Sequence, residues 1–299
     1  MKVLVTGATG FLGRPVVRSL IHNGHSVLAL SRKKKESTNT QQLIWLQGDL
    51  AHPSEYHKEV QAFAPEAVIH LAWQDIPDFS FETSRQNLNQ SIDLLSFILD
   101  LGCCKKIMVS GSDKELNKPS GVCQESEKGT PNNGFSWAKH SLRSWLEIVC
   151  AKNTVSLGWF RVFFCYGPGQ RSASLLPTLL KHLPQNTLPE LQTPKNANDY
   201  VFVDDVANAF SKAMSIDFPS GIYNIGSGVS TTVLEMCRIS EQVVRGTDEL
   251  TFKLETKTKD IDASIDFWAD LTQTNKHINW QPTTSLAEGI ERTLEWMRS

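Results

Sequence analysis

Three glycines near the amino terminus carry the clearest chemical signal in the sequence. Gly7, Gly10 and Gly13 follow the apolar run 3–5 at intervals of three residues, and apolar residues then recur at helical spacing to position 21. A strand, a glycine turn and a helix in this order let main-chain N–H groups and the positive end of the helix dipole approach a pyrophosphate. The stretch therefore predicts a dinucleotide site, and the flanking elements disfavour the alternative of a tight turn without a ligand.

The end of the second predicted strand bears on which dinucleotide is bound. Ser31 and Arg32 follow the strand 26–30, and no carboxylate occurs between Gly13 and Glu36. NAD-selective sites carry an Asp or Glu here for the ribose hydroxyls, whereas an arginine can hold a 2′-phosphate through two parallel hydrogen bonds. We therefore expect NADP(H) to be favoured over NAD(H), with a solvated basic loop as the alternative.

Further candidate contacts follow the next two strands. Asp49 comes after the apolar run 43–46, where its carboxylate would accept from an adenine amino group or cap the next helix. Trp73 and Gln74 begin the loop after the strand 65–72, at the edge of the sheet where doubly wound proteins bind ligands. His70 lies on that strand and is interpreted as a core histidine rather than a catalytic one.

These residues must be positioned by an alternation of strands and helices through the first half of the chain. Beyond residue 168 the alternation loosens. We therefore expect an α/β protein with a Rossmann-type doubly wound parallel sheet over residues 1–168, to which some later segments return, and a smaller α/β substrate lobe over 169–299. The expected strands are 3–5, 26–30, 43–46, 65–72, 106–109 and 155–164, and long amphipathic helices are expected at 83–101 and 135–150.

Composition disfavours several other classes of protein. The 299 residues carry a formal net charge of −2, with 40% hydrophobic and 21% charged residues, as is ordinary for a globular protein. No basic field favours nucleic acid, and no apolar run is long enough to span a bilayer. The six cysteines form no C-x-x-C pair or zinc spacing, so we expect free thiols and no metal site. Without a charged and then apolar leader, a cytoplasmic location is expected.

A series of motifs in the right order resembles the extended short-chain dehydrogenase/reductases, specifically the NAD(P)-dependent nucleotide-sugar epimerase/dehydratase group. The resemblance covers nearly the whole chain. Its landmarks are residues 6–13, 48–50, 68–72, Asn87, Arg161 with 166–169, 199–207, 223–228, and 280–282 with Leu286, Gly289 and Trp296.

The resemblance implies a nucleotide-sugar substrate and a catalytic Ser or Thr, Tyr and Lys. The Tyr exchanges a proton with the sugar hydroxyl, and the Lys lowers the pKa of the Tyr and holds the nicotinamide ribose. By position Ser112 and Lys139 match, but Phe135 stands in the place of the Tyr and Asp113 follows the Ser. Asn198 replaces the usual Arg of the lobe strand, which weakens the match to a sugar-diphosphate site.

The predicted site combines the residue patterns with the resemblance. Its catalytic candidates are Ser112, Lys139, Asp113 and Phe135 at the Tyr position. The cofactor-binding candidates are Gly7, Thr9, Gly10, Phe11, Leu12, Ser31, Arg32, Asp49, Leu50, Leu71, Ala72, Trp73, Val109, Lys139 and Arg161. The substrate-binding candidates are Gln74, Ser112 and Asn198.

Three interpretations stay open because phenylalanine has no ionisable hydrogen. The first is an NADP(H)-dependent reductase of a nucleotide-linked 4-keto-6-deoxy sugar, with the proton supplied by Ser112, Asp113, water or a substrate hydroxyl. A 4-epimerase is the alternative reaction, although it must also reverse the hydride transfer. The second is a dinucleotide-binding sensor or regulatory subunit, and the third is an enzyme of another carbonyl or alcohol. The resemblance also implies a homodimer through helices 83–101 and 135–150.

Overall fold

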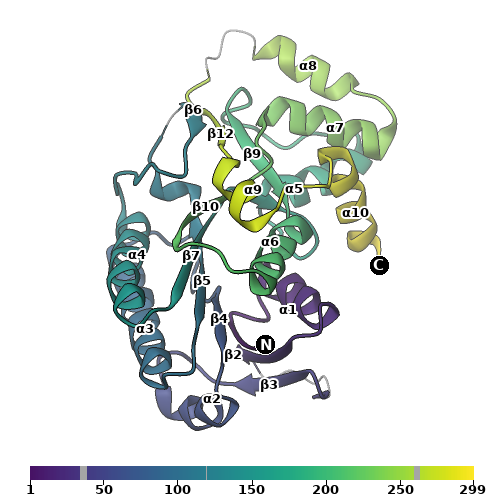
Figure 1. Ribbon diagram of the computed structural model, residues 1–299. Helices are drawn as coiled ribbons and strands as arrows, with labels where there is room; N and C mark the ends of the chain where they lie inside the picture. Colours follow the sequence, from purple (N-terminus) through teal and green to yellow (C-terminus); the bar gives the residue numbers. More distant parts are fainter. Residues whose placement is uncertain (34–38, 119, 259–262) are drawn as a thin grey trace.

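The computed structural model describes residues 1–33, 39–118, 120–258 and 263–299 (Figure 1). Within them, seven parallel strands form the main sheet in the order β10-β7-β5-β4-β1-β2-β3. The order changes direction between β1 and β4, which confirms the predicted doubly wound sheet and locates its ligand crevice there. These strands are β1 (Lys2–Thr6), β2 (Ser26–Ser31), β3 (Leu43–Gln47), β4 (Ala67–His70), β5 (Lys106–Ser112), β7 (Ser156–Val162) and β10 (Gly221–Ile225).

The inner strands are apolar on both sides because helices cover both faces of the sheet (Figure 1). Val3 and Val5 of β1 pack in one core with helices α1 (Gly13–His22) and α6 (Val203–Ser215). Leu4, between them, packs in the opposite core with α2 (His57–Phe63), α3 (Phe81–Asp100) and α4 (Gly134–Lys152). The two predicted long helices are therefore α3 and α4, side by side on one face.

A smaller sheet and its helices form the rest of the chain. Its strands run in the order β11-β9-β12-β6, and β8 pairs with β9. A third core joins this sheet to α5, α7 and α10. The elements are β6 (Ser120–Cys123), β8 (Phe164–Tyr166), β9 (Ala197–Phe202), β11 (Ser230–Thr232), β12 (Asp266–Ala269), α5 (Leu175–His182), α7 (Val233–Arg245), α8 (Glu249–Lys257), α9 (Thr272–Ile278) and α10 (Leu286–Arg298), with 3₁₀ turns η1 (Pro53–Glu55), η2 (Asp113–Glu115) and η3 (Leu183–Gln185).

Three strands, β6, β8 and β10, pair with strands on the other side of the predicted boundary at residue 168. β10 belongs to the main sheet, where it pairs with β7, and β6 joins the smaller sheet beside β12. The single strand expected at 155–164 is in fact two, because the chain leaves the main sheet after β7 so that β8 can pair with β9. The two sheets are therefore interleaved along the chain. In the described part of the chain, no helix combines the length and the apolar character that a bilayer crossing requires.

Candidate functional site

Two adjoining cavities open at the carboxyl ends of the main-sheet strands. The β2-side cavity, of about 220 Å³, is lined by the ends of β1, β2 and β4 and by residues 48–50. The α4-side cavity, of about 580 Å³, runs from the glycine loop to α4 and the segment 162–174. Both are lined by Gly7, Gly10, Arg32, Leu71, Trp73 and Gln74, so a single elongated ligand can occupy them together.

The glycine loop between β1 and α1 forms the floor of both cavities. Its glycines present main-chain atoms there and no side chains. Gly7 has φ +66°, and a Cβ there would lie 2.8 Å from the N of Ala72. A Cβ on Gly13 would lie 2.1 Å from the carbonyl oxygen of Gly7, so α1 can start against the loop only with glycine at this position. The first turn of α1 has no side-chain cap and no acidic residue, which leaves its positive end available to an anion.

The end of β2 provides hydroxyl and cationic groups to the β2-side cavity. The Ser31 and Thr9 hydroxyl oxygens lie 2.9 Å apart, and Nη1 of Arg32 lies 3.4 Å from Oε1 of Gln74. Lys33 also lines this cavity, opposite Asp49 and Leu50. Residues 34–38, which continue the basic tract, lie outside the described residues. Hydroxyls and a guanidinium at a strand end are groups that bind a phosphate.

A buried hydrogen-bond network fixes the end of β4. Thr6 Oγ1 lies 2.9 Å from His70 Nδ1, and His70 Nε2 lies 2.9 Å from Ser91 Oγ, which donates to Asn87 O. Burial lowers the pKa of His70 to about 3. His70 is thus a neutral, fully bonded core residue, as its place on a buried strand predicts.

The same network positions the loop that follows β4. The N–H of Ala72 donates to Thr6 Oγ1, and the N–H of Gln74 donates to Oδ1 of Asn87 at 2.8 Å. Between them, the indole Nε1 of Trp73 is buried and has no hydrogen-bond partner among the described residues. Trp73 lines both cavities, and its indole nitrogen is a buried donor whose hydrogen is unused within the described residues.

Helix α4 carries the closed end of the α4-side cavity. The Phe135 ring packs 5.5 Å from Trp73 and 5.2 Å from Phe79, centroid to centroid. One turn later, Nζ of Lys139 lies 3.9 Å from the Trp73 ring centre and donates to Ser110 O at 2.9 Å. Lys139 is only 3% exposed, and this burial lowers its pKa to about 7. The Tyr position is therefore an apolar wall beside a desolvated amine.

The carboxyl end of β5 places Ser112 and Asp113 in the same cavity. Ser112 Oγ donates to Oδ1 of Asp113 at 3.0 Å and accepts from the N–H of Lys114. Glu115, fully buried, accepts from the N–H of Ser112 at 2.8 Å and from the Trp159 indole. Ser112 and Asp113 thus face the cavity, and Glu115 holds them from behind.

Three predicted site residues do not line either cavity. Val109 packs in the core under α3 and α4. Arg161 is fully buried and donates to the Gln124 and Glu127 carbonyls and to Asn224, so it joins the segment 124–127 to β10 instead of contacting a dinucleotide. Asn198 lies on β9, where Nδ2 approaches the Tyr200 hydroxyl at 3.5 Å. Because neither Val109 nor Arg161 lines either cavity, the structure gives no support to their expected cofactor contacts.

The structure adds lining residues that sequence patterns did not identify. Phe79 completes the aromatic wall, and Arg171 donates to the carbonyl of Ile76, bridging the loop after β4 and the segment after β8. Gln170 Oε1 is buried without a partner in the described part of the chain. These residues lie in loops without a motif, and only their convergence on the α4-side cavity identifies them.

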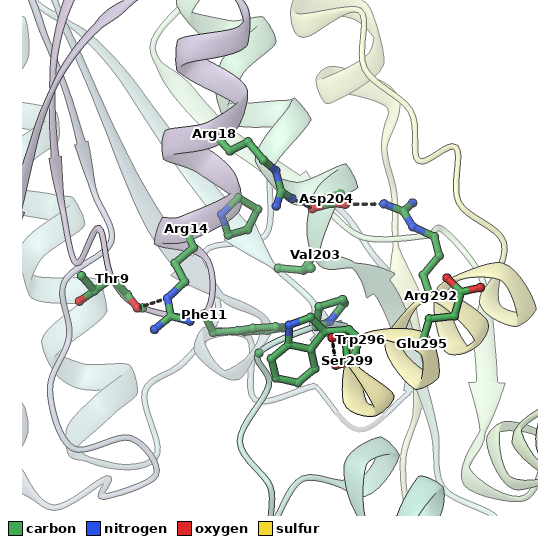
Figure 2. Close-up of a pocket in the computed structure, with 14 residues that line it drawn as sticks. Thr9, Phe11, Arg14, Arg18, Val203, Asp204, Arg292, Glu295, Trp296 and Ser299 are labelled. Atoms are coloured by element: carbon green, nitrogen blue, oxygen red, sulfur yellow. Dashed lines mark hydrogen bonds and ion pairs between the residues drawn. The ribbon is translucent and has the colours of Figure 1, made fainter. Parts of the chain in front are cut away.

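A third cavity, of about 750 Å³, lies on the outer side of the glycine loop, between α1, α6 and α10 (Figure 2). Asp204 bridges two arginines there, with Arg18 at 2.7 Å and Arg292 at 2.5 Å. Nε of Arg14 donates to Thr9 O at 3.0 Å. Figure 2 shows these side chains converging from three helices. The ion pairs of Asp204 join α1 to α10 of the smaller lobe.

The first two cavities fit an NAD(P) molecule on structural grounds. The glycine loop packs so closely on the main chain of Leu71, Ala72 and Ala8 that neither Gly7 nor Gly13 has room for a Cβ, and the start of α1 has no side-chain cap. At the far end, the buried Lys139 lines the α4-side cavity and carries an amine with hydrogens to donate. Residues that line both cavities connect these two ends.

Comparison with known proteins identifies the family. Residues 3–226 match the sequence model of the NAD dependent epimerase/dehydratase family. The UDP-glucose 4-epimerase of Mycolicibacterium smegmatis is 26% identical over 317 aligned positions, covering 100% of this chain and 99% of that protein. The dTDP-4-dehydro-6-deoxyglucose reductase of Escherichia coli is 21% identical, covering 99% of this chain and 97% of that protein.

A solved structure agrees with the fold. The UDP-glucose 4-epimerase of Thermotoga maritima, determined with UDP-glucose, superimposes with a TM-score of 0.83 at 23% identity and covers 100% of this chain and 99% of its own. The match of residues 3–226 extends over most of the chain and includes the glycine loop, β4, β5 and α4. The chain belongs to the NAD dependent epimerase/dehydratase family.

Proposed function

We propose that the chain is an NADP(H)-dependent oxidoreductase that reduces the 4-keto group of a nucleotide-linked deoxy sugar. The observation that carries this proposal is the closed end of the α4-side cavity. There the aromatic wall of Trp73, Phe79 and Phe135 stands beside Lys139, Ser112 and Asp113. An apolar wall next to a few convergent polar groups suits a carbonyl held beside a methyl-bearing deoxy carbon.

The dinucleotide would lie across both cavities. Its pyrophosphate would rest on the glycine loop, with the adenosine near Ser31 and Asp49 and the nicotinamide end near Trp73 and Lys139. When bound in its reduced form, the nicotinamide supplies a hydride. The protein groups then have to orient the substrate, exclude water and supply one proton to the carbonyl oxygen.

A reductase suits this residue set better than the other reactions of the family. A reductase moves one hydride and one proton in a single direction, whereas an epimerase must return both to the opposite face. A dehydratase needs further acid and base groups, and Lys114 follows Asp113 where a second carboxylate would be required. The related reductase of Escherichia coli supports the same choice. The 4-epimerase stays the second candidate because the Mycolicibacterium smegmatis relative carries that name.

Consumption of NADPH with a panel of UDP- and dTDP-linked 4-keto-6-deoxy hexoses tests the proposal. We expect oxidation of NADPH in step with formation of the 4-hydroxy sugar nucleotide. Interconversion of 4-epimers without net NADPH consumption would instead support the second candidate. If the protein binds NADPH but converts none of these compounds, the proposed catalysis is contradicted. The dinucleotide-binding sensor or regulatory subunit is then the interpretation that fits.

The preference for NADP(H) rests on the end of β2. Ser31, Arg32 and Lys33 line the β2-side cavity, and Thr9 shares a hydrogen bond with Ser31. A guanidinium held near Gln74 can turn onto a 2′-phosphate, whereas the described residues at this strand end, Ser31 to Lys33, include no carboxylate for free ribose hydroxyls. The family name specifies NAD, so the proposed use of NADP(H) would be a departure from that general description.

Replacing the arginine measures this preference. Arg32→Ala is expected to weaken NADPH binding about 10- to 150-fold, because a hydrogen bond to a charged group contributes about 1.5–3 kcal/mol. NADH binding should change less than about twofold. Fluorescence titrations of both dinucleotides check this, with Arg18→Ala as the control, since Arg18 pairs with Asp204 outside the β2-side cavity. Tighter binding of NADH than NADPH by the unmodified protein would contradict the proposal.

We also propose that two copies associate through α3 and α4. Ile148 on α4 and Phe81 at the start of α3 are 71% and 63% exposed, which leaves large apolar side chains on this face. Ile148→Lys is expected to convert a dimer to a monomer in analytical ultracentrifugation, because it places a charge within an apolar contact. Val229→Lys, at an apolar residue of the other lobe that is 59% exposed, should leave the mass unchanged. A monomeric unmodified protein would overturn this assignment.

A further inference from the structure

The α4-side cavity lacks the phenol that usually serves as the acid in this family. The chain has four tyrosines, and none of them lines the cavity. Tyr166 bonds to carbonyls at residues 285 and 286, and Tyr223 donates to Pro219 O. Tyr200 faces the third core and Tyr56 lies under β2 and β3. A proton for a substrate oxygen must therefore come from another group.

Lys139 is the nitrogen donor best placed to replace it. It lies one helical turn after Phe135, so both side chains project from the same face of α4. Its Nζ lies 5.7 Å from the Phe135 ring centre. The Phe135 ring stands where the ring of the usual tyrosine would be. One of the Lys139 hydrogens is donated to Ser110 O, and the Trp73 face covers another side. An ammonium group has three hydrogens, which leaves a donor for the cavity.

The charged and titratable groups around Lys139 do not neutralise it by direct pairing. His70 on β4 is neutral, with both ring nitrogens bonded. Glu115 on η2 attracts the ammonium charge from a distance, but its oxygens are bonded to Ser112, Trp159 and Arg143. Asp113 accepts from Ser112, and Lys114 is exposed at the cavity rim. The amine is thus held by a carbonyl and an aromatic face and can give up a proton.

Ser112 is poorly suited to the same task. Its single hydroxyl hydrogen is donated to Asp113, and its oxygen already accepts from the N–H of Lys114. A hydroxyl bonded in this way offers a lone pair and no hydrogen to the cavity. Ser112 can therefore orient a substrate hydroxyl by accepting from it, whereas Lys139 offers hydrogen.

We infer that Lys139 is the general acid, and that its ammonium group protonates the substrate carbonyl oxygen directly. This inference rests on the proposed function. As the carbonyl carbon accepts the hydride, its π electron pair moves onto oxygen, and that oxygen takes a proton from Nζ. The C=O group becomes a secondary alcohol, and Lys139 becomes a neutral amine. Solvent reprotonates the amine after the product leaves.

The direction of the pH dependence follows from this assignment. Burial places the pKa of Lys139 near 7, so the protonated form predominates below that pH and is lost above it. Ketone reduction requires the protonated form, so kcat is expected to fall as pH rises through about 7. An acid whose pKa lies near the working pH combines an adequate protonated fraction with easy proton release.

The protonation of Lys139 can be measured without substrate or dinucleotide. In protein labelled with ¹⁵N at lysine side chains, one Nζ resonance is expected to titrate near pH 7, and Lys139→Arg should remove it. Lys152→Arg, at the exposed end of α4, should leave it in place. An Nζ resonance assigned to Lys139 that titrates above about 9 would overturn the inference, since lysine has a reference pKa of about 10.4.

Kinetics separate proton donation from a merely positive charge. Lys139→Arg keeps the cation but cannot release its proton, and is expected to lower kcat about 10²–10⁴-fold and to abolish the fall above pH 7. Lys139→Gln should lower kcat by a similar factor. It provides a second test if Lys139→Arg does not fold. Dissociation constants for NADPH report any loss of binding separately.

The outcomes distinguish this inference from the proposed function. Lys139→Arg with kcat within threefold of the unmodified protein, and with the same pH profile, would overturn the acid role while leaving the reductase activity intact. An unmodified protein that binds NADPH but reduces no ketone would overturn the proposed function and the acid role with it, even where Nζ titrates near 7.

Discussion

Gly13→Ala is expected to weaken dinucleotide binding about five- to 150-fold, because overpacking costs about 1–3 kcal/mol and the glycine loop must absorb it. The new Cβ would lie 2.1 Å from the carbonyl oxygen of Gly7 and 2.8 Å from the main chain of Ala8. These are main-chain atoms, which cannot move aside by changing a rotamer. Either α1 retreats from β1 or the loop deforms, and both remove N–H groups from the pyrophosphate position.

The same helix supplies a matched control at its other end. Gly24→Ala adds a Cβ that meets nothing within 4 Å, although the positive φ of +78° makes the residue strained. This variant should lose about 1–2 kcal/mol of stability with unchanged affinity for NADPH. Melting curves and fluorescence titrations of both variants separate the two effects. Equal affinity of Gly13→Ala and the unmodified protein would argue against a pyrophosphate over this loop.

Glu115→Ala is expected to reduce the free energy of unfolding by about 3–5 kcal/mol, which is the usual result of breaking one side of a buried ion pair. Arg143, 3% exposed, would lose its buried carboxylate partner, and the Trp159 indole and the Ser112 N–H would lose their acceptor. Of its two ion pairs among the described residues, the arginine would keep only the one with the exposed Glu147. Because Glu115 also holds Ser112, turnover should fall with stability.

Glu147 provides the comparison on the same arginine. It lies 3.7 Å from Nε of Arg143 and is 53% exposed, so Glu147→Ala should cost only about 0.3–0.5 kcal/mol. Urea unfolding of the two variants gives the difference directly. Losses of similar size would mean that Glu115 is not the partner that stabilises the buried arginine.

Much of the fold could be predicted because local and global preferences agree. The β-branched and aliphatic runs that form β1, β2 and β4 are buried on both faces, so they stand out from their surroundings. β6 and β12 could not be predicted in the same way. Residues 120–123 are partly exposed and contain glycine, and they become a strand only by pairing with residues 266–269, far along the chain.

The site shows the same division between local and long-range information. The glycine loop and the ends of β2 and β4 were predicted from short motifs that need only neighbouring residues. Arg161 shows the limit of that reasoning, because its place on β7 gave no sign that its side chain bonds to residues 124–127 and 224. The low pKa of Lys139 depends on burial by Trp73 and Phe135, which only the folded arrangement reveals.

One dinucleotide is proposed to occupy both cavities, with its nicotinamide end beside Lys139 and Trp73. A crystal structure of the chain with NADPH bound tests it most directly. We predict the pyrophosphate on residues 7–13, the 2′-phosphate beside Arg32 and the nicotinamide end within reach of Lys139. A cleft that stays closed to saturating NADPH, or a nicotinamide end directed away from α4, would contradict the account.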